Sequence, residues 1–409
     1  MLGSTGSIGC ATLDVVRHAG DRMQIVALSA HTNTSLLAEQ VREFQPEIVV
    51  VTGFRLQTPD FRFQTFGTET RSPKPEVFHD SDALCEIVTR DDIDVVVSAI
   101  VGSAGLQSTL SAVEAGKTVA LANKESLVAG GELVTEATKK SGGKIIPIDS
   151  EHSAIWQCLE REWRVARGKG RELRNSQASP SQTLAPGPSS LTPTIILTAS
   201  GGPFRDLSRQ ELERVTVADA LAHPTWSMGK KITVDSATLM NKALEIIEAR
   251  WLFDMPPEKI RVVLHPQSVV HSMVEFVDGA VMAQLSPPDM RLPIQWAIDY
   301  PNRFPCPARR IDWETMMTLE FFPPDFERFP ALQLGMEVAA QGGTAGAVIN
   351  AANEVAVEAF LQEKLPFHQI TTVCQSVLHH HNHERRPTFT QLMAADRWAR
   401  SETQKWISR

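Results

Sequence analysis

The stretch Gly3-Ser4-Thr5-Gly6-Ser7-Ile8-Gly9 decides the fold, because it places three glycines three residues apart directly before the helix-compatible run 10–18. Such a loop lets backbone N–H groups approach a pyrophosphate at the positive end of a helix. Only Met1 and Leu2 precede the loop, so we expect the first strand of its sheet to be missing or nearly so. Taken alone, the loop is also compatible with an ordinary tight turn.

Short β-branched runs follow the glycine loop and alternate with helical stretches, a pattern typical of a parallel sheet covered by crossover helices. The runs are 23–29, 47–52, 93–100, 117–122 and 144–149, and the helices between them are 34–44, 105–116 and 126–141. We therefore predict an α/β protein whose residues 1–148 form a Rossmann-like domain with a truncated first strand.

The second half of the chain has a different pattern. Residues 164–194 turn basic and then rich in Ser, Pro, Gly and Gln, which predicts a disordered surface insertion. Asp278-Gly279 joins two apolar runs and predicts a hairpin, so a central catalytic domain, 149–299, has a partly antiparallel sheet. A Pro-rich linker, 300–330, precedes four helices that predict a C-terminal bundle over 331–409.

Composition excludes several classes of protein. The 409 residues carry 40 Lys and Arg against 48 Asp and Glu, and this net charge of −8 argues against binding to nucleic acid or to an anionic membrane. Five scattered cysteines indicate neither a disulfide framework nor a cysteine zinc site, which favours a reducing compartment. Tyr300 is the only tyrosine and has no lysine four residues on, which argues against dehydrogenases that use a Tyr/Lys pair.

Two acidic segments are candidates for a metal site. If the chain is still extended after the run 144–148, Asp149 and Glu151 share one face and offer two oxygen ligands where a strand ends. Asn241, Lys242 and Glu245 share one helix surface and could hold a phosphate beside a metal. The alternatives are a helix cap at the first segment and an exposed ion pair at the second.

Two loops complete the set of candidate ligand-binding segments. The segment 198–204 places Ser200 before two glycines after a strand, as in a phosphate cradle. Trp226 and Met228 lie in a Gly/Pro-flanked segment, 223–231, which suits a lid or, alternatively, a buried anchor for a surface loop. The histidines of 379–383 have no carboxylate site beside them, so we expect no functional metal there.

Together these segments resemble the 1-deoxy-D-xylulose 5-phosphate reductoisomerases, with six motifs in the family's order. They are Gly3–Gly9, Ala122–Leu127, Asp149–His152, Ala199–Phe204, His223–Gly229, and Asn241-Lys242 with Glu245. The resemblance implies an enzyme that uses NADPH and Mg²⁺ or Mn²⁺ to convert 1-deoxy-D-xylulose 5-phosphate to 2-C-methyl-D-erythritol 4-phosphate, for isoprenoid synthesis. It also implies a homodimer in the bacterial cytoplasm, and the short N-terminus leaves a plastid location open.

The resemblance assigns a role to each matching residue. Metal ligands would be Asp149, Glu151 and Glu245, with Lys124 beside the metal and the reacting oxygens. Substrate contacts would come from Glu151, Lys124 and Glu245, and from Ser150, Ser200, His223, Trp226, Met228, Ser236, Asn241 and Lys242. Cofactor contacts would come from Thr5, Gly6, Ser7, Ile8, Asn33, Asn123, Glu125 and Gly229.

The cofactor preference follows from one further segment. Ala30-His31-Thr32-Asn33 holds no Asp or Glu to bind a free ribose 2′-hydroxyl, which favours NADPH over NADH. His31 as a solvated loop residue is the alternative, and the segment lacks the glycine that the family often has there.

Two other functions remain possible at this point. One is a non-catalytic nucleotide and metal sensor, which would bind nucleotide without turnover. The other is an NADP-dependent dehydrogenase of another small substrate, such as a semialdehyde dehydrogenase, which needs an activated cysteine at a helix start.

Overall fold

The computed structural model describes residues 1–53, 74–159, 192–226 and 228–408, which form two compact units. The first unit comprises 1–123, 137–149 and 289–308, and the second comprises 124–136, 150–288 and 309–409. Each unit is described by itself below. The expected insertion lies almost entirely outside the described residues; of its last residues, Thr194 begins a strand.

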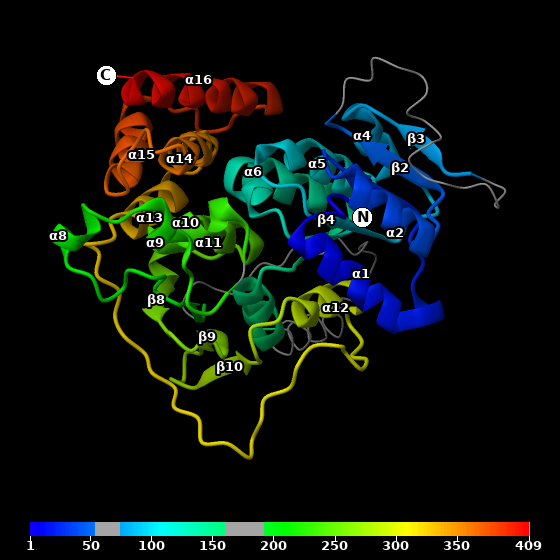
Figure 1. Cartoon of the computed structure of the whole chain (residues 1–409), viewed down its shortest axis with the longest axis horizontal. Helices are drawn as coiled ribbons and strands as arrows, with labels where there is room; N and C mark the ends of the chain where they lie inside the picture. Colours follow the sequence, from blue (N-terminus) through cyan, green and yellow to red (C-terminus); the bar gives the residue numbers. More distant parts are fainter. Residues whose placement is uncertain (54–73, 160–191, 227, 409) are drawn as a thin grey trace, which may run out of the picture. The chain divides into compact units, whose positions relative to one another are not determined.

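Two three-stranded parallel sheets form the first unit (Figure 1). One has the order β1 (Ala27–Ala30), β2 (Ile48–Val51) and β3 (Glu76–Phe78). The other has the order β4 (Val95–Ser98), β5 (Thr118–Leu121) and β6 (Lys144–Pro147). The strands are buried β-branched runs, as expected for a sheet that helices cover on both faces.

The N-terminal residues join these two sheets. Leu2 pairs in parallel with Ser98 of β4, donating its N–H to Val97 O (2.9 Å) and accepting from Ala99 N (3.1 Å). On the other side, Met1 O accepts from Ser29 N of β1 at 3.1 Å. Two residues therefore take the place of the central strand, and the glycine loop begins at the carboxyl edge of a continuous parallel arrangement.

Helices cover the first unit on two faces. They are α1 (Ser7–Ala19), α2 (Thr34–Phe44), α4 (Asp82–Ile87), α5 (Leu106–Glu114) and α12 (Arg291–Asp299), with short 3₁₀ turns η1 (Gly20–Arg22) and η2 (Ser103–Gly105). Ile294 and Ala297 of α12 are buried with Val15 of α1 and Ile146 of β6. This apolar face explains why 289–308 belong to the first unit, whereas we expected the central domain to run on to residue 299.

A four-stranded mixed sheet lies in the second unit, in the order β10 (Val281–Leu285), β9 (Val270–Glu275), β7 (Thr194–Ala199) and β8 (Ile260–Leu264). β7 and β8 are parallel, whereas β9 is antiparallel to both β7 and β10. Gly279 has φ +84° in the turn between β9 and β10, so the predicted Asp-Gly hairpin is present. The predicted α/β class with a partly antiparallel second sheet is confirmed.

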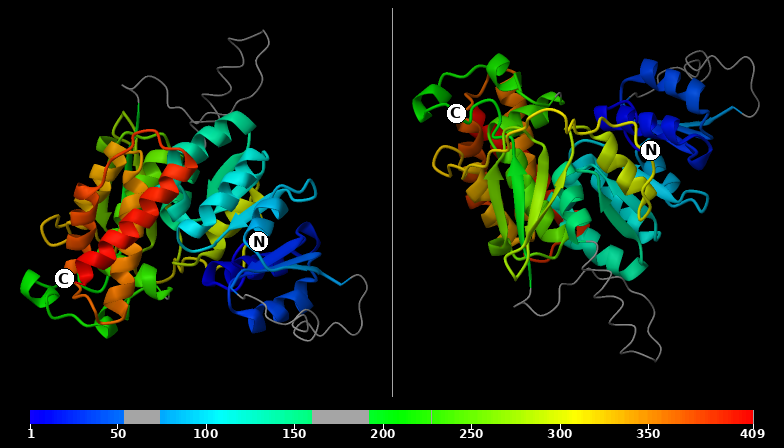
Figure 2. Two further views of the ribbon diagram at one scale, coloured as in Figure 1. Left: turned by 90° about the horizontal axis from the view of Figure 1, so that it is seen from above. Right: turned by 90° about the horizontal axis from the view of Figure 1, so that it is seen from below.

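Most of the second unit is helical. Its helices are the start of α6 (Lys124–Ser141), residues 150–159, α8 (Arg209–Leu212), α9 (Val217–Leu221), α10 (Lys230–Ala237), α11 (Met240–Leu252), η4 (Pro257–Lys259), α13 (Ala331–Gln341), α14 (Ala345–Leu361), α15 (Gln369–His380) and α16 (Phe389–Ile407). Figure 2 shows α16 lying along the helices that precede it. The expected C-terminal helices are present, but they share one compact unit with the mixed sheet.

Close helix contacts enclose α11. A Cβ on Gly335 of α13 would lie 2.7 Å from Ala243 Cα, and one on Gly131 of α6 would lie 2.2 Å from Trp251 Cδ1. Real Cβ atoms do not approach so closely, so only glycine fits at these two crossings. The chain thus packs α6 and α13 directly against α11.

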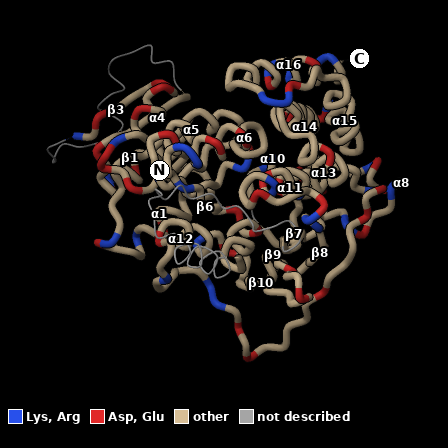
Figure 3. The backbone as a smooth tube through the Cα atoms, turned by 180° about the vertical axis from the view of Figure 1, so that it is seen from behind, with Lys and Arg blue, Asp and Glu red and all other residues tan. Residues whose placement is uncertain are grey.

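Charged residues of both signs are interleaved along the described chain (Figure 3). On α1, for example, Arg17 contacts Asp14 at 3.0 Å and Glu43 of α2 at 2.5 Å. Such exposed pairs contribute little stability, about 0–1 kcal/mol each.

Candidate active site

The acidic segment after β6 lies beside α11. Asp149 is the last residue of the first unit and is joined directly to Ser150, where the next helix begins. One carboxylate oxygen each from Asp149, Glu151 and Glu245 lies within 4.8 Å of the others. Of the two geometries considered for this segment, the helix start is present and the extended chain is not, because 150–159 are helical. The three predicted ligands nevertheless lie together.

Two lysines contact these carboxylates. Lys124 Nζ lies 3.2 Å from Glu245 Oε1 and donates to Asn241 Oδ1 at 2.7 Å. Lys242 Nζ donates to Glu151 Oε1 at 2.7 Å and pairs with Glu245 Oε2. Both lysines and Glu245 are buried, so the ammonium groups offset carboxylate charge that would otherwise be costly to bury. The cluster therefore combines three acids with two bases, and its deficit of one positive charge favours a bound cation.

A break between α10 and α11 orients the second segment. Asp235 is helical in α10, and the chain turns at Leu239 before α11 begins. Leu239 has φ +58° although it is not glycine, and it is buried. Strained backbone of this kind persists only where surrounding packing holds it. It starts α11 so that Asn241 and Glu245 share one face, where Asn241 Nδ2 donates to Glu245 Oε1 at 2.6 Å.

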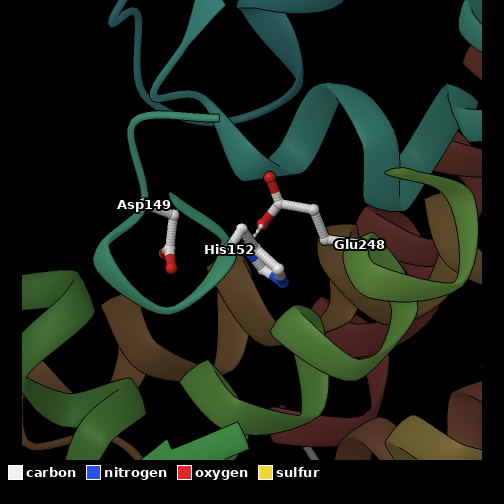
Figure 4. A group of neighbouring side chains, drawn as sticks. All are labelled: Asp149, His152 and Glu248. Carbon is white, nitrogen blue, oxygen red and sulfur yellow. Dashed lines mark ion pairs between the residues drawn. The ribbon is translucent and has the colours of Figure 1, made fainter. Parts of the chain in front are cut away.

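A buried His152–Glu248 pair supports the acidic cluster (Figure 4). His152 Nδ1 lies 3.1 Å from Glu248 Oε2, and His152 Nε2 lies 3.0 Å from the backbone oxygen of Glu245. A carbonyl can only accept, so Nε2 is the donor in the contact with the backbone oxygen of Glu245. His152 thus links its own helix to α11 at two points. The sequence could not predict this contact of Glu248, because its partner, His152, lies 96 positions away along the chain.

Ser200 and Ser236, two of the predicted phosphate-binding residues, form a separate cluster with His223, whereas Asn241 and Lys242 contact the acidic cluster. The hydroxyl oxygens of Ser200 and Ser236 each lie 3.1 Å from His223 Nε2. His223 Nδ1 accepts from the backbone nitrogens of Thr225 (3.2 Å) and Trp226 (2.9 Å), so the ring proton is on Nε2. Burial lowers the pKa of His223, and the charge of Arg205 lowers it further, so the ring is neutral at neutral pH. Three O–H and N–H groups therefore converge from the loop after β7, the loop between α9 and α10, and α10 itself.

Close packing fixes the Ser200 loop against α10. Gly202 has φ +66°, and a Cβ there would lie 2.6 Å from the backbone oxygen of Ser236. The N–H of Gly202 also donates to Ser200 Oγ at 3.2 Å. These contacts leave no room for another residue type at position 202 and hold both hydroxyls near His223.

The predicted lid segment is partly described. Trp226 and Met228 are half-buried, and Ser227 lies outside the described residues. The Trp226 ring packs near His271, with ring centroids 6.3 Å apart. Gly229 precedes α10 with φ −63°, and no atom lies within 4 Å of where its Cβ would be. Among the residues that the structure describes, no contact therefore requires glycine at position 229.

A second buried ion cluster holds the start of α10. Lys231 Nζ lies 3.1 Å from Glu125 Oε1 and 3.0 Å from Asp235 Oδ2. Burial opposes the charge of Glu125, but the ammonium of Lys231 outweighs it and lowers the pKa of Glu125. Asn353 of α14 donates to Asp235 Oδ1 at 2.8 Å. The predicted cofactor residue Glu125 thus also anchors the helix that follows the lid segment.

The glycine loop uses its three glycines in two ways. A Cβ on Gly3 would lie 2.6 Å from Ala99 O, and one on Gly9 would lie 2.3 Å from Ser4 O. A Cβ on Gly6 would lie 3.6 Å from Gly3 O, at an ordinary φ of −77°. Packing therefore requires glycine at positions 3 and 9. At position 6, the lack of a side chain leaves space in front of the backbone N–H groups of Ser7 and Ile8, and a pyrophosphate needs this space to approach them closely.

The remaining predicted cofactor residues shape neighbouring loops. Asn33 Oδ1 accepts from Leu36 N at 3.2 Å and caps α2, while His31 Nδ1 lies 3.0 Å from Thr52 Oγ1. Asn123 Nδ2 donates to the backbone oxygens of Ile100 (2.5 Å) and Gly102 (2.9 Å). Thr5 lies in the glycine loop. These side chains thus hold three loops at the carboxyl edge of the first unit's strands.

Four of the five cysteines lack the lowered pKa of an activated thiol. Burial raises the pKa of Cys158 to about 11, and it also raises the pKa of Cys85, Cys306 and Cys374. The semialdehyde dehydrogenase hypothesis needs a thiol with a lowered pKa, so these four thiols do not support it. The C-terminal histidines have separate partners: His379 contacts Glu337, His381 contacts Thr344, and His383 contacts Gly342 O.

Three family models match the chain. Their descriptions are 1-deoxy-D-xylulose 5-phosphate reductoisomerase at residues 1–131, its C-terminal domain at 145–253, and the DXP reductoisomerase C-terminal domain at 285–402. A reductoisomerase of that name from Rhodopirellula baltica is 47% identical over 99% of this chain and 94% of its own length. One from Geobacter metallireducens is 46% identical over 100% and 98%. This chain belongs to the 1-deoxy-D-xylulose 5-phosphate reductoisomerase family.

Solved structures of the family have the same fold. The Zymomonas mobilis reductoisomerase in complex with NADPH is 39% identical, with a TM-score of 0.84 over 99% of this chain and 97% of that one. A second reductoisomerase, in complex with NADPH, fosmidomycin and magnesium, is 37% identical, with a TM-score of 0.86 over 100% and 97%.

Within the described residues, no helix is both long and apolar enough to cross a membrane.

Replacing Glu248 tests its support of the metal site. Glu248→Leu removes the contact with His152, and we expect the Mg²⁺ concentration for half-maximal rate to rise about tenfold, as for other residues that orient ligands. Glu248→Gln keeps a hydrogen bond to a neutral ring and should have a smaller effect. The control is Arg250→Leu on the same helix, which removes the ion pair of Arg250 with Asp254, whose charged atoms lie 3.2 Å apart. Equal metal dependence of the Glu248→Leu and Arg250→Leu variants would contradict the assignment.

Alanine substitutions separate the two uses of glycine. Gly6→Ala should leave the melting temperature nearly unchanged but weaken NADPH binding, because the added methyl group occupies the space before the loop. Gly9→Ala should lower the melting temperature by several degrees, since its Cβ meets the Ser4 carbonyl. Thermal unfolding and NADPH fluorescence measure both. Unchanged NADPH affinity in the Gly6→Ala variant would count against the cofactor loop.

Proposed function

We propose that this chain converts 1-deoxy-D-xylulose 5-phosphate to 2-C-methyl-D-erythritol 4-phosphate, using NADPH and Mg²⁺ or Mn²⁺. The observation that carries the proposal is the cluster of Asp149, Glu151 and Glu245 with Lys124 and Lys242. Relatives of this name that align over nearly the whole chain support it.

The three carboxylates suit a hard divalent cation. Asp149, Glu151 and Glu245 offer only oxygen donors, which Mg²⁺ and Mn²⁺ prefer. When bound, the cation would polarise the ketone and the neighbouring hydroxyl of the substrate. In the structure, Lys124 contacts Oε1 of Glu245 and Lys242 contacts Oε2.

The lysines would also act on the reacting sugar. Lys124 Nζ donates to Asn241 Oδ1 at 2.7 Å and lies 3.2 Å from Glu245 Oε1, so the ammonium lies beside the carboxylates that we assign to the cation. We assign to Nζ the role of stabilising negative charge on a substrate oxygen as the carbon skeleton rearranges. Ser150, whose hydroxyl donates to Glu151 Oε2 at 2.5 Å, lies beside the same cluster and would contact the sugar.

The substrate phosphate would bind at the hydroxyl cluster. Ser200, Ser236 and neutral His223 supply O–H and N–H donors. Asn241 and Lys242, which contact the carboxylates from α11, are the two further phosphate contacts that we assign. Holding the phosphate orients the distant reacting carbons and supplies binding energy for the rearrangement. Trp226 and Met228 would cover the bound sugar and exclude water.

The glycine loop would hold the cofactor. Thr5, Gly6, Ser7 and Ile8 would contact NADPH, whose nicotinamide supplies the hydride that reduces the rearranged aldehyde. The further contacts that we assign are Asn33, Asn123, Glu125 and Gly229. The open backbone at Gly6 and Gly229 supports this assignment.

A coupled assay tests the proposal. Oxidation of NADPH by the full chain should require both 1-deoxy-D-xylulose 5-phosphate and Mg²⁺ or Mn²⁺, and Glu245→Gln should lower kcat by at least about 10³-fold while NADPH affinity stays nearly intact. The Gln side chain keeps the volume of Glu245, and circular dichroism checks folding. Turnover without a metal would contradict the proposal, and NADPH binding without turnover would favour the sensor.

We also propose that the chain works as a homodimer. β10 is an edge strand of the mixed sheet and exposes Val281 (50%) and Met282 (46%). Trp313 (74%) and Met316 (98%) are exposed in the segment before α13. Unpaired strand edges and exposed apolar side chains are typical of surfaces that a partner covers.

Charge substitutions test the dimer. Trp313→Asp with Met316→Asp should shift the molar mass measured by light scattering from that of two chains toward that of one, because the new charges would be buried in the interface. Val101→Asp, at an equally exposed valine of the first unit (75%), is the control. A monomeric wild-type chain would contradict the proposal.

A bacterial cytoplasmic location is the remaining part of the proposal. The bacterial relatives and the five free cysteines, Cys10, Cys85, Cys158, Cys306 and Cys374, support it.

A further inference from the structure

Gln40 of α2 holds the glycine loop from a second helix. Ser4 Oγ donates to Gln40 Oε1 at 2.7 Å, and Gln40 Nε2 donates to the backbone oxygen of Ser4 at 2.9 Å. Both residues are buried, with exposed fractions of 0% for Ser4 and 5% for Gln40. One amide therefore holds both the side chain and the backbone of a single loop residue, 36 positions away.

The chemistry of this contact is specific to an amide. The acceptor oxygen faces a hydroxyl and the donor nitrogen faces a carbonyl, so a glutamate would place an oxygen against an oxygen and an apolar side chain would leave both groups unpaired. The Ser4 carbonyl is also where Gly9 packs, at the start of α1. Gln40 thus holds the loop at the point from which α1 departs.

The same helix follows the second predicted cofactor loop. α2 begins at Thr34, directly after the segment 30–33, and Asn33 caps it. Gln40 lies about 9 Å along the axis from Thr34, at ~1.5 Å per residue. The start of α2 therefore ends the loop 30–33, and Gln40, farther along the same helix, holds the glycine loop.

We propose that Gln40 is a positioning residue that sets the separation between the glycine loop and the loop 30–33, which NADPH has to bridge. A dinucleotide contacts both loops at once, so its affinity depends on their separation as well as on each loop. A ligand that contacts only one loop does not depend on the separation. The inference rests on the proposed NADPH site and adds to it a residue that need not touch the cofactor.

The test compares a bridging ligand with a fragment. In the full-length Gln40→Met variant, which keeps the side-chain length, we expect the Kd for NADPH to rise about tenfold. The Kd for adenosine 2′-monophosphate, which reaches only the ribose end, should stay within about twofold, as should kcat at saturating NADPH. Ser4→Ala removes one of the two hydrogen bonds and should give a smaller rise in the Kd for NADPH. This second variant tests the inference if Gln40→Met fails to fold.

Ser141→Ala is the matched control. Ser141 Oγ also makes one donated and one accepted hydrogen bond in the first unit, with Val113 O at 2.5 Å and Gly143 N at 3.1 Å. It should lower stability without changing the affinity for NADPH. NADPH affinity that is unchanged in Gln40→Met, or lost equally for NADPH and for the fragment, would overturn the inference. Failure of the wild-type chain to bind NADPH would instead refute the proposed function on which it rests.

Discussion

The buried carboxylate of Glu245 is the constraint on which the second unit depends. It is 0% exposed and contacts Lys124 through one oxygen and Lys242 through the other. Removing one partner of such a buried pair costs about 3–5 kcal/mol, so the start of α6 and α11 have to stay together. The same requirement shapes the proposed metal site, because the carboxylates that the lysines contact are the ones that we assign to the cation. Stability and cation affinity therefore depend on one set of charges.

The helices at the end of the chain enclose this charge cluster. Gly335 of α13 and Gly131 of α6 contact α11 so closely that no side chain fits at either crossing. Lys231, Glu125 and Asp235 form a second buried cluster that Asn353 of α14 completes. A helix of the segment that resembles a separate bundle in the sequence thus contributes to this second buried cluster, and burial strengthens the electrostatic contacts within it.

The sequence predicts elements that rest on local signals, and it misses contacts between distant residues. The bounds of α2 agree with its periodicity, and the Asp-Gly turn predicts its hairpin, because neighbouring residues determine both. Asp149 and Glu151 were recognisable because they follow an apolar run, and Glu245 because it shares a helix surface with Asn241 and Lys242. In contrast, nothing local marks Gln40 or Glu248 as a partner of the glycine loop or of His152. The return of α12 to the first unit was missed for the same reason, since an amphipathic helix does not specify which core it covers.

Binding of Mn²⁺ to wild-type and Lys242→Met chains, followed by electron paramagnetic resonance, tests the charge balance most directly. Met keeps the apolar stem of Lys242 but removes the ammonium that competes with a cation for Glu151 and Glu245. The account predicts one bound Mn²⁺ per chain in both proteins. It also predicts a several-fold lower Kd in the variant, because the ammonium of Lys242 no longer competes with the cation for these carboxylates. Equal or weaker Mn²⁺ binding in the Lys242→Met chain would contradict it, because the lysine would then support the cation rather than substitute for it.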